Sequence, residues 1–316
     1  MSKPGSIVTV GLCPSWDRVC EFDGIEWGEH KLVSASHIRP AGKAMNISQA
    51  LAWMGQKSIA AGLWGEDDYA LLMRATQPLK RFISVKVTPV EGGTRQNVTI
   101  VDTRNHREMH LRHRCDLASV DALKRLRTDL ERIVKKNSVC AFAGLMPGRK
   151  YLDNIIRMIE FCTERGAGVV VDTSGPALKE ILDTGRVWMI KPNVEEMREL
   201  MGKDIPNRPL SLARAGRNLL DRVKVVLISR GAKGAVVVTR DGAWQGKCTK
   251  TRKVLATVGC GDYMLAGFLN GTKNTSNVGV ALATAIKAGT AMAWGCTHTH
   301  SWEQVCRRTT VKVDRI

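Results

Sequence analysis

The sequence lacks several features that would place it in other classes of protein. Its 316 residues contain no run of eighteen or more uncharged apolar residues, so a membrane-spanning helix is not expected. The stretch MSKPGSIVTVGL leads into a strand-like segment and has none of the layout of an export signal. Aromatic residues make up only 5% of the chain, and no stacking platform for nucleic acid is visible. A cytoplasmic protein without membrane contact is expected.

Paired cysteine motifs are also missing. The nine cysteines are odd in number, widely scattered and form no Cys-x-x-Cys pair, so neither a disulfide framework nor a structural zinc site is favoured. The run from Cys296 to His300 has no accompanying ligand cluster. Most of the cysteines are expected to be small buried apolar residues in a reducing compartment.

Acidic residues are few in comparison with basic ones. The chain has 48 Lys and Arg against 30 Asp and Glu, and its net charge of +18 attracts polyanions or phosphorylated small molecules. Charge alone does not choose between these partners. The cations are spread along the chain, and the densest run, 104–114, alternates polar and apolar residues as a strand does, so nucleic-acid binding is not expected.

What the sequence does contain is an alternation of short apolar runs and longer amphipathic stretches. Four runs predict strands that are covered on both faces, at 139–144, 168–174, 187–193 and 223–229. Between them, apolar residues at helical spacing predict crossover helices over 121–136 and 152–165. This pattern predicts an α/β protein with a mostly parallel central sheet.

Two further regions depart from this pattern. The Asp241-Gly242 pair predicts a hairpin, and hence an antiparallel margin of the sheet. Alternating residues within about 13–40 and 92–114 predict the strands of a small β lid that flanks a helix-forming segment at 41–55. Because no repeat or low-complexity linker is visible, one domain over 1–316 is expected.

The segment with the clearest chemistry is TVGCGDYMLAGFL, residues 257–269. Its Gly-x-Gly turn delivers Asp262 onto the first turn of an apolar helix. Backbone N–H groups of Gly259, Cys260 and Gly261 would stabilise a forming negative charge, and the Asp262 carboxylate could take a proton. The alternative is a plain turn in which Asp262 caps the helix.

This turn resembles the C-terminal signature of the ribokinase-like, or PfkB, carbohydrate kinases, whose Gly-Ala-Gly-Asp turn holds the catalytic Asp. The resemblance covers about residues 7–295. It implies a three-layer α/β/α fold with a β lid, ATP and Mg²⁺ as nucleotide and metal, and Asp262 as the base. Because the lids of this family often pair, it also makes a homodimer through the lid an expectation.

Three segments are similar to the substrate-binding motifs of the 1-phosphofructokinases and tagatose-6-phosphate kinases of this family. They are 13–17 for Asn-Pro-Ser-x-Asp, 41–46 for Gly-Gly-Lys-Gly-x-Asn, and 93–95 for Gly-x-Thr-Arg. The resemblance implies that Asp17 and Asn46 hold sugar hydroxyls and that Lys43, which follows Gly42, meets a substrate phosphate together with Arg95. From the residues alone, the two cations could equally be ordinary surface charge.

Two more segments resemble the family's nucleotide site. Lys191-Pro192-Asn193-Val194-Glu195-Glu196 is similar to its Asn-x-x-Glu element, which implies that Lys191 and Asn193 lie at the nucleotide and that Asn193 and Glu196 organise Mg²⁺. A helix start after Pro192 is the structural alternative. The nucleotide loop is implied for Ser229, Arg230, Gly231, Ala232, Lys233 and Gly234. Strand-end loops at 144–148 and 172–175 are expected to face the same site.

The resemblance therefore predicts a kinase that phosphorylates a primary hydroxyl of a ketohexose phosphate with ATP and yields a sugar bisphosphate. A kinase for another sugar or nucleoside, a catalytically silent sugar-phosphate sensor and a basic nucleic-acid-binding protein remain as alternatives. Four residues depart from the motifs: Cys13, Ala41, Ala44 and Tyr263. A methyl group at 41 or 44 would narrow the turn at Lys43, and a tyrosine at 263 would crowd the phosphate path.

Overall fold

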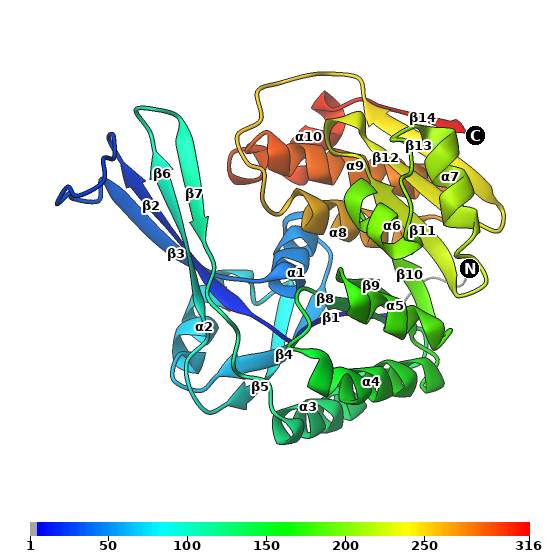
Figure 1. Ribbon diagram of the computed structural model, residues 1–316, viewed down its shortest axis with the longest axis horizontal. Helices are drawn as coiled ribbons and strands as arrows, with labels where there is room; N and C mark the ends of the chain where they lie inside the picture. The colour runs from blue at the N-terminus through cyan, green and yellow to red at the C-terminus, as the bar shows by residue number, and fades with distance from the viewer. Residues whose placement is uncertain (1–4) are drawn as a thin grey trace.

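A ten-stranded sheet runs through the computed structural model, which describes residues 5–316 (Figure 1). Its order is β14-β13-β12-β11-β10-β9-β8-β1-β4-β5. The bounds are β1 Ile7–Gly11, β4 Ser58–Gly65, β5 Ile83–Val90, β8 Val139–Ala143, β9 Gly168–Asp172, β10 Val187–Ile190, β11 Val223–Ser229, β12 Ala235–Thr239, β13 Gly242–Cys248 and β14 Val311–Arg315. The strands from β5 to β11 pair in parallel, and β11 to β14 form an antiparallel margin. The predicted mostly parallel sheet is confirmed.

Helices cover both faces of this sheet. One layer consists of α3 Val120–Ile133, α4 Leu152–Glu164, α5 Pro176–Asp183, α6 Val194–Met201 and α7 Pro209–Arg217, and the other of α1 Lys43–Trp53, α8 Cys260–Asn274 and α9 Val278–Ala293. Two further helices, α2 Tyr69–Thr76 and α10 Trp302–Arg308, lie outside these layers. The layers explain why the strands are apolar throughout: in β8, Cys140 and Phe142 pack toward the first layer while Val139 and Ala141 pack toward the second.

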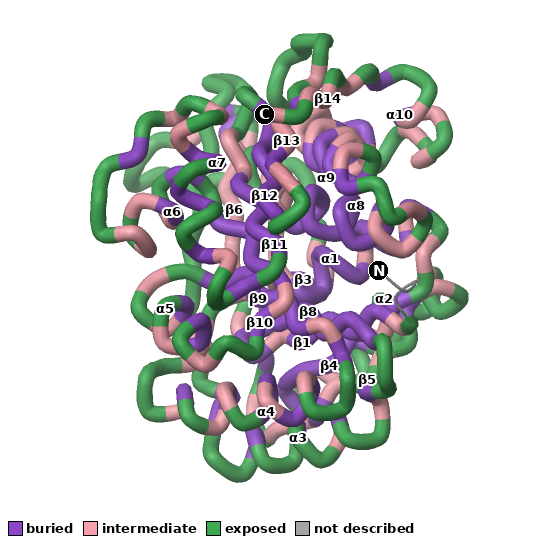
Figure 2. The backbone as a smooth tube through the Cα atoms, turned by 90° about the vertical axis from the view of Figure 1, so that its right-hand side faces the viewer, coloured by how far each residue is buried: buried purple, intermediate pink, exposed green. Residues whose placement is uncertain are grey.

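Burial follows the same arrangement. Figure 2 shows buried backbone running through the central strands and along α8, and exposed backbone on the outer helices and loops. Within residues 5–316, no helix combines the length and the apolar character needed to cross a membrane.

A second sheet of four strands stands to one side of the first (Figure 1). We call it the lid; its order is β3-β2-β6-β7, with β2 Ser15–Phe22, β3 Ala35–Ala41, β6 Gln96–Asp102 and β7 Arg107–Leu111. These strands fall in the two stretches where lid strands are expected, except that β3 ends one residue later. The base of the lid joins the body through Trp16, whose ring meets Trp64 edge-on at 5.5 Å between centroids.

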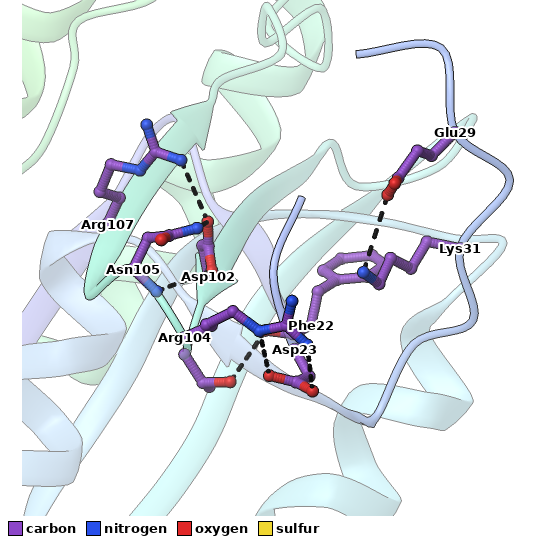
Figure 3. Close-up of polar contacts among 9 residues, drawn as sticks. Phe22, Asp23, Glu29, Lys31, Asp102, Arg104, Asn105 and Arg107 are labelled. Atoms are coloured by element: carbon purple, nitrogen blue, oxygen red, sulfur yellow. Dashed lines mark hydrogen bonds and ion pairs between the residues drawn. The ribbon is translucent and has the colours of Figure 1, made fainter. Parts of the chain in front are cut away.

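Polar contacts hold the turns at the far end of the lid. Figure 3 shows Arg104 paired with Asp23, at 2.9 Å between Nη2 and Oδ2, and Asp102 accepting hydrogen bonds from Asn105 and Arg107. The Arg104–Asp23 pair is exposed, so solvent screens it and it adds little stability, whereas the Asp102 carboxylate is buried and its hydrogen bonds satisfy it.

Candidate active site

Asp262 lies at the start of α8. The helix begins at Cys260, and the residue before it, Gly259, has φ +85°, a backbone conformation that side chains other than glycine rarely adopt. At Gly261, an added Cβ would lie 3.2 Å from the Lys191 ammonium nitrogen, so glycine there leaves room for that cation. The first N–H groups of a helix have no partner within the helix. The turn therefore combines free amide donors, a lysine and a carboxylate.

The Asp262 side chain is held by α1. Asn46 Nδ2 donates a hydrogen bond of 2.8 Å to Asp262 Oδ2, and both side chains are buried, with 5% and 6% of their surfaces exposed. The contact joins two segments that are 216 residues apart. It brings together two residues that the resemblance assigned separately to the substrate and to the base.

Burial changes the acidity of Asp262. Loss of hydration raises the pKa of this carboxyl to about 6, and the nearby charge of Asp172 acts in the same direction. The hydrogen bond from Asn46 and the charges of Lys43 and Lys191 oppose the rise in pKa. At pH 7 a group with a pKa of about 6 is roughly nine-tenths ionised, so Asp262 can act as a base and is a stronger one than an ordinary aspartate.

A second buried carboxylate, Asp172, binds two lysines. Lys43 Nζ lies 3.1 Å from Asp172 Oδ1, and Lys191 Nζ lies 3.5 Å from Asp172 Oδ2. Burial acts to lower the pKa of Lys43, but the charges of Asp172 and Asp262 hold it above its usual value. Asp172 is only 1% exposed, and its two ion pairs fix both lysines, of which Lys191 lies beside Gly261.

Asp172 was expected to face the site on the strand-end loop 172–175, but the sequence assigned it no role. The available signal was a carboxylate at the end of an apolar strand of a parallel sheet. Its partners could not be read from the sequence, because they lie at the start of α1 and just after β10.

The lid contributes a row of polar residues. Asp17 on β2 lies in register with Arg39 on β3 and Asn97 on β6. Asp17 Oδ1 accepts hydrogen bonds of 3.0 Å from Ser15 Oγ and from Asn97 Nδ2. The sequence did not single out Asn97 or Arg39.

This face of the lid turns toward α8. The positive charge of Arg39 acts on the Tyr263 hydroxyl, and Thr257 Oγ1, just before the turn at 259–261, donates a hydrogen bond of 3.2 Å to Glu108 Oε1 on β7. The row that carries Asp17 is therefore on the side of the lid that meets this turn.

Arg95 has partners that the sequence did not reveal. Its guanidinium donates to three backbone carbonyl oxygens, those of Cys13 and Pro14 at 3.1 Å each and that of His113 at 2.9 Å. Three of its five N–H donors are thus engaged in tying loops together. A contact between Arg95 and a substrate phosphate stays a prediction that depends on the remaining donors.

Asn193 and Glu196 form the cap of α6. Asn193 Oδ1 accepts from the Glu196 N–H at 2.9 Å, and Glu196 Oε2 accepts from the Asn193 N–H at 2.8 Å, which completes a capping box. The helix start that the sequence offered as an alternative is present. The capping box leaves Glu196 Oε1 available. The negative charge of Glu196 also helps to raise the pKa of Lys43, although less than the charges of Asp172 and Asp262 do.

The expected nucleotide loop follows β11. The Ser229 N–H donates to the Pro192 carbonyl at 2.9 Å, so the loop is joined to the segment with Lys191 and Asn193. The Arg230 side chain turns to Asn207, with 2.8 Å between Nε and Oδ1. The short helix Gly231–Lys233 contains Ala232, and Gly234 follows it at φ +85°. A Cβ at Gly234 would collide with the Gly246 carbonyl, so close packing against β13 requires this glycine.

Two departures from the motifs have a structural explanation. The Tyr263 ring is 6% exposed and packs against Trp53, with 6.0 Å between centroids, so it belongs to the apolar layer around α8. The methyl group of Ala44 lies next to Gly11, where an added Cβ would come within 3.2 Å of it. Because residue 11 is a glycine, there is room for the methyl group.

Comparison with known proteins gives a consistent result. The model of the "pfkB family carbohydrate kinase" matches residues 5–301. A 1-phosphofructokinase from Rhodobacter capsulatus is 30% identical over 293 residues, covering 92% of this chain and 89% of the relative. One from Haemophilus influenzae is 27% identical over 285 residues, covering 90% of each.

Among solved structures, phosphofructokinase-2 from Escherichia coli in complex with substrates and products has the same fold. It superposes with a TM-score of 0.88 at 21% identity, covering 96% of this chain and 98% of that one.

Proposed function

Because the chain belongs to the pfkB family of carbohydrate kinases, and is thus a phosphotransferase, we propose that it transfers the γ-phosphoryl group of ATP to the free primary hydroxyl of a ketohexose phosphate. Fructose 1-phosphate is the first substrate we propose, because the relatives at 27% and 30% identity are 1-phosphofructokinases. The product is a sugar bisphosphate. The observation that carries the proposal is the buried Asp262 carboxylate, held by Asn46 at the start of α8.

The proposed reaction begins with a proton transfer. The acceptor hydroxyl gives its proton to Asp262 as its oxygen attacks the γ-phosphorus, and ADP leaves on the opposite side. The pKa of Asp262, raised to about 6 by burial, supports this role because the group is ionised at neutral pH but binds a proton more readily than an exposed aspartate.

The second requirement is stabilisation of negative charge on the transferred group. The N–H groups of Gly259, Cys260 and Gly261 at the start of α8 are the proposed donors, and Lys191 lies next to Gly261. Because Asp172 already fixes Lys191, this cation needs little reorganisation during the reaction.

Sugar binding is proposed for the residues between the lid and α1. Asp17 and Asn46 would hold hydroxyls, and Lys43, which follows Gly42 at φ +94°, would meet the phosphate that the substrate already carries. Arg95 would support this pocket mainly by fixing the Cys13-Pro14 loop, and its free N–H donors could reach the same phosphate.

For the nucleotide, we propose the loop from Ser229 to Gly234 together with Lys191 and Asn193. For Mg²⁺ we propose Asn193 and Glu196: one carboxylate oxygen of Glu196 is outside the capping box, and the side-chain oxygen of Asn193 accepts the Glu196 N–H. Carboxylate oxygens suit Mg²⁺, which keeps several waters and needs few protein ligands. Within residues 5–316, no group of three or more His, Cys, Asp or Glu side chains is placed so that it could hold a metal ion by itself. When bound with ATP, Mg²⁺ neutralises phosphate charge.

A homodimer through the lid and a cytoplasmic location are proposed as well. Met109 and Leu111 are 45% and 43% exposed on β7, opposite Ile100 and Val98 of β6, so one face of the lid offers an apolar surface that a second copy could cover. The nine cysteines are all unpaired, and ATP is the proposed donor; both support a reducing, nucleotide-containing compartment.

The function is tested with a substrate panel. ADP release is measured with fructose 1-phosphate, fructose 6-phosphate, tagatose 6-phosphate, their neutral sugars and a set of nucleosides, with Asp262→Asn as the matched inactive control. We expect the highest kcat/KM with fructose 1-phosphate and loss of turnover in the variant. Sugar-phosphate binding without turnover would identify a sensor instead, and preference for a neutral sugar or nucleoside would refute the phosphate pocket.

A further inference from the structure

A second cavity lies at the edge of the main sheet opposite the candidate active site. We call it the amino-edge cavity, because it is lined by the residues with which the chain enters β1, β4 and β5, three neighbouring strands that run in parallel (Figure 1). Its volume is about 350 Å³. The candidate active site lies past the other end of β1, where Gly11 meets Ala44. Because the five residues of β1 span about 16 Å, the two sites are separate.

Four cations from three segments line this cavity. Lys57 precedes β4, Lys80 and Arg81 precede β5, and Lys273 lies in the last turn of α8. Among the residues that the structure describes, no Asp or Glu lines the cavity. Like charges repel, so four cations around one space destabilise the folded protein unless an anion neutralises them.

The four cations are available to such an anion. Within residues 5–316, none of them forms an ion pair with a carboxylate. Lys57, Lys80 and Arg81 are exposed, and Lys273 is half-buried. The Arg81 guanidinium lies over the Phe82 ring, 5.7 Å from its centroid, which positions this group at the cavity and leaves its N–H donors for a ligand.

Another cavity of the molecule is lined differently, so the net charge of +18 does not by itself explain a purely cationic lining. It lies at the amino ends of β10 and β11, has a volume of about 410 Å³ and is lined by side chains of both signs, among them Asp221, Arg222 and Asp241. Arg222 is paired with Asp183, with 2.8 Å between Nη1 and Oδ1. The protein therefore compensates charge there by itself, which it does not do at the amino-edge cavity.

We propose that the amino-edge cavity binds a small molecule that carries two or more phosphate groups. One phosphate ester bears about two negative charges at neutral pH and would leave two of the four cations without a counter-charge. Arg81 suits two oxygens of one phosphate, and the lysines suit the others as point charges. Half-buried Ile59 and Phe82 form an apolar wall for an organic part of the ligand. A concave site favours a small ligand over the extended phosphate row of a nucleic acid.

The experiment is isothermal titration of the full chain with inorganic tripolyphosphate. It is run at roughly 0.15 M salt, where charges more than about 8 Å apart are largely screened. We expect the wild type to show a site that Lys80→Gln/Arg81→Gln loses or binds at least about tenfold more weakly, because two charged contacts are missing. Any binding at the other edge of the sheet is common to both proteins, so the difference isolates the amino-edge cavity.

The matched control is Arg214→Gln/Arg217→Gln, which removes two exposed cations from α7 and changes the net charge equally. It should keep the site, and all variants should keep the wild-type urea midpoint within error, since they replace exposed side chains. Lys57→Gln/Lys273→Gln should lose the same site, although it changes other elements. Equal weakening in the α7 control, or an unchanged site in both cavity variants, would overturn the proposal.

Further titrations identify the ligand. Fructose 1,6-bisphosphate and guanosine triphosphate carry the same chemistry on a sugar and on a nucleoside, and the compound whose binding depends most on Lys80 and Arg81 shows which organic part fits. Orthophosphate should displace tripolyphosphate from the site at least about tenfold less well, and equal displacement would refute the need for a second phosphate. Tighter displacement by a single-stranded oligonucleotide would identify a nucleic-acid surface and overturn the small-ligand proposal. None of these readouts requires turnover, so they do not depend on the proposed kinase activity.

Discussion

Replacing Asp262 by Asn should make the protein more stable while removing its activity. The carboxylate is 6% exposed, and burial raises its pKa from 3.8 to about 6. The folded protein therefore holds the charged form at a cost, which neutral Asn would not incur. Loss of a general base lowers turnover by about two to four orders of magnitude.

The size of the stability effect follows from the shift in pKa. A group whose folded pKa lies above its unfolded value stabilises the fold below about pH 4, and this stabilisation is lost as the pH rises through about 6. The difference of 6 − 3.8 = 2.2 units corresponds to at most about 3 kcal/mol. Asp262→Asn should thus exceed the wild type by about 1–3 kcal/mol at pH 7, and the difference should vanish near pH 4.

The assay is urea unfolding of both proteins without ligands at pH 4 and pH 7, because bound substrates would stabilise the folded state by mass action. Turnover of fructose 1-phosphate is measured on the same samples. An Asn variant that is no more stable than the wild type at pH 7 would refute the buried-charge argument. A variant with unchanged kcat would refute the role of Asp262 as the base.

Three further outcomes are expected. In the wild type, kcat/KM should fall as the pH drops below about 6, because burial raises the pKa of Asp262 to about that value and the protonated group is no longer a base. A pH–rate profile that stays flat down to pH 5 would contradict this. Asp172→Asn should release Lys43 and Lys191 and lower kcat/KM by about tenfold to a hundredfold, which corresponds to the loss of a charged hydrogen bond of about 1.5–3 kcal/mol. Unchanged kinetics in this variant would show that the two ion pairs do not contribute to catalysis. Arg95→Ala should raise the KM for phosphorylated substrates and also lower the urea midpoint, since it leaves three carbonyl contacts unmade; an equal rise for neutral sugars would exclude a phosphate contact.

Much of the fold could be predicted, because local patterns specify it. The apolar runs at 139–144, 168–174, 187–193 and 223–229 became β8, β9, β10 and β11, since strands buried on both faces need apolar residues throughout. The Gly-x-Gly turn before Asp262 began a helix for an equally local reason, the backbone conformation of Gly259.

The partners of the site residues could not be predicted in the same way. Asn193 and Glu196 were expected at a metal and also cap α6, which their spacing of three residues allows. Arg95 was expected at a phosphate, and its guanidinium is bonded to carbonyls from two distant loops. A carbonyl oxygen occurs at every residue, so no residue type in the sequence marks those that will accept.

The sequence by itself determined the parallel sheet, the position of the lid strands and the turn that carries Asp262, because hydrophobic periodicity and glycine conformation act over a few residues. Only the tertiary structure decided that Asn46 bonds Asp262 and that Asp172 binds both Lys43 and Lys191. These contacts join segments that are far apart in the chain, and they form because parallel strands and the connections of the lid end at the same edge of the sheet. Their charges and burial, in turn, set the acidity on which the proposed chemistry depends.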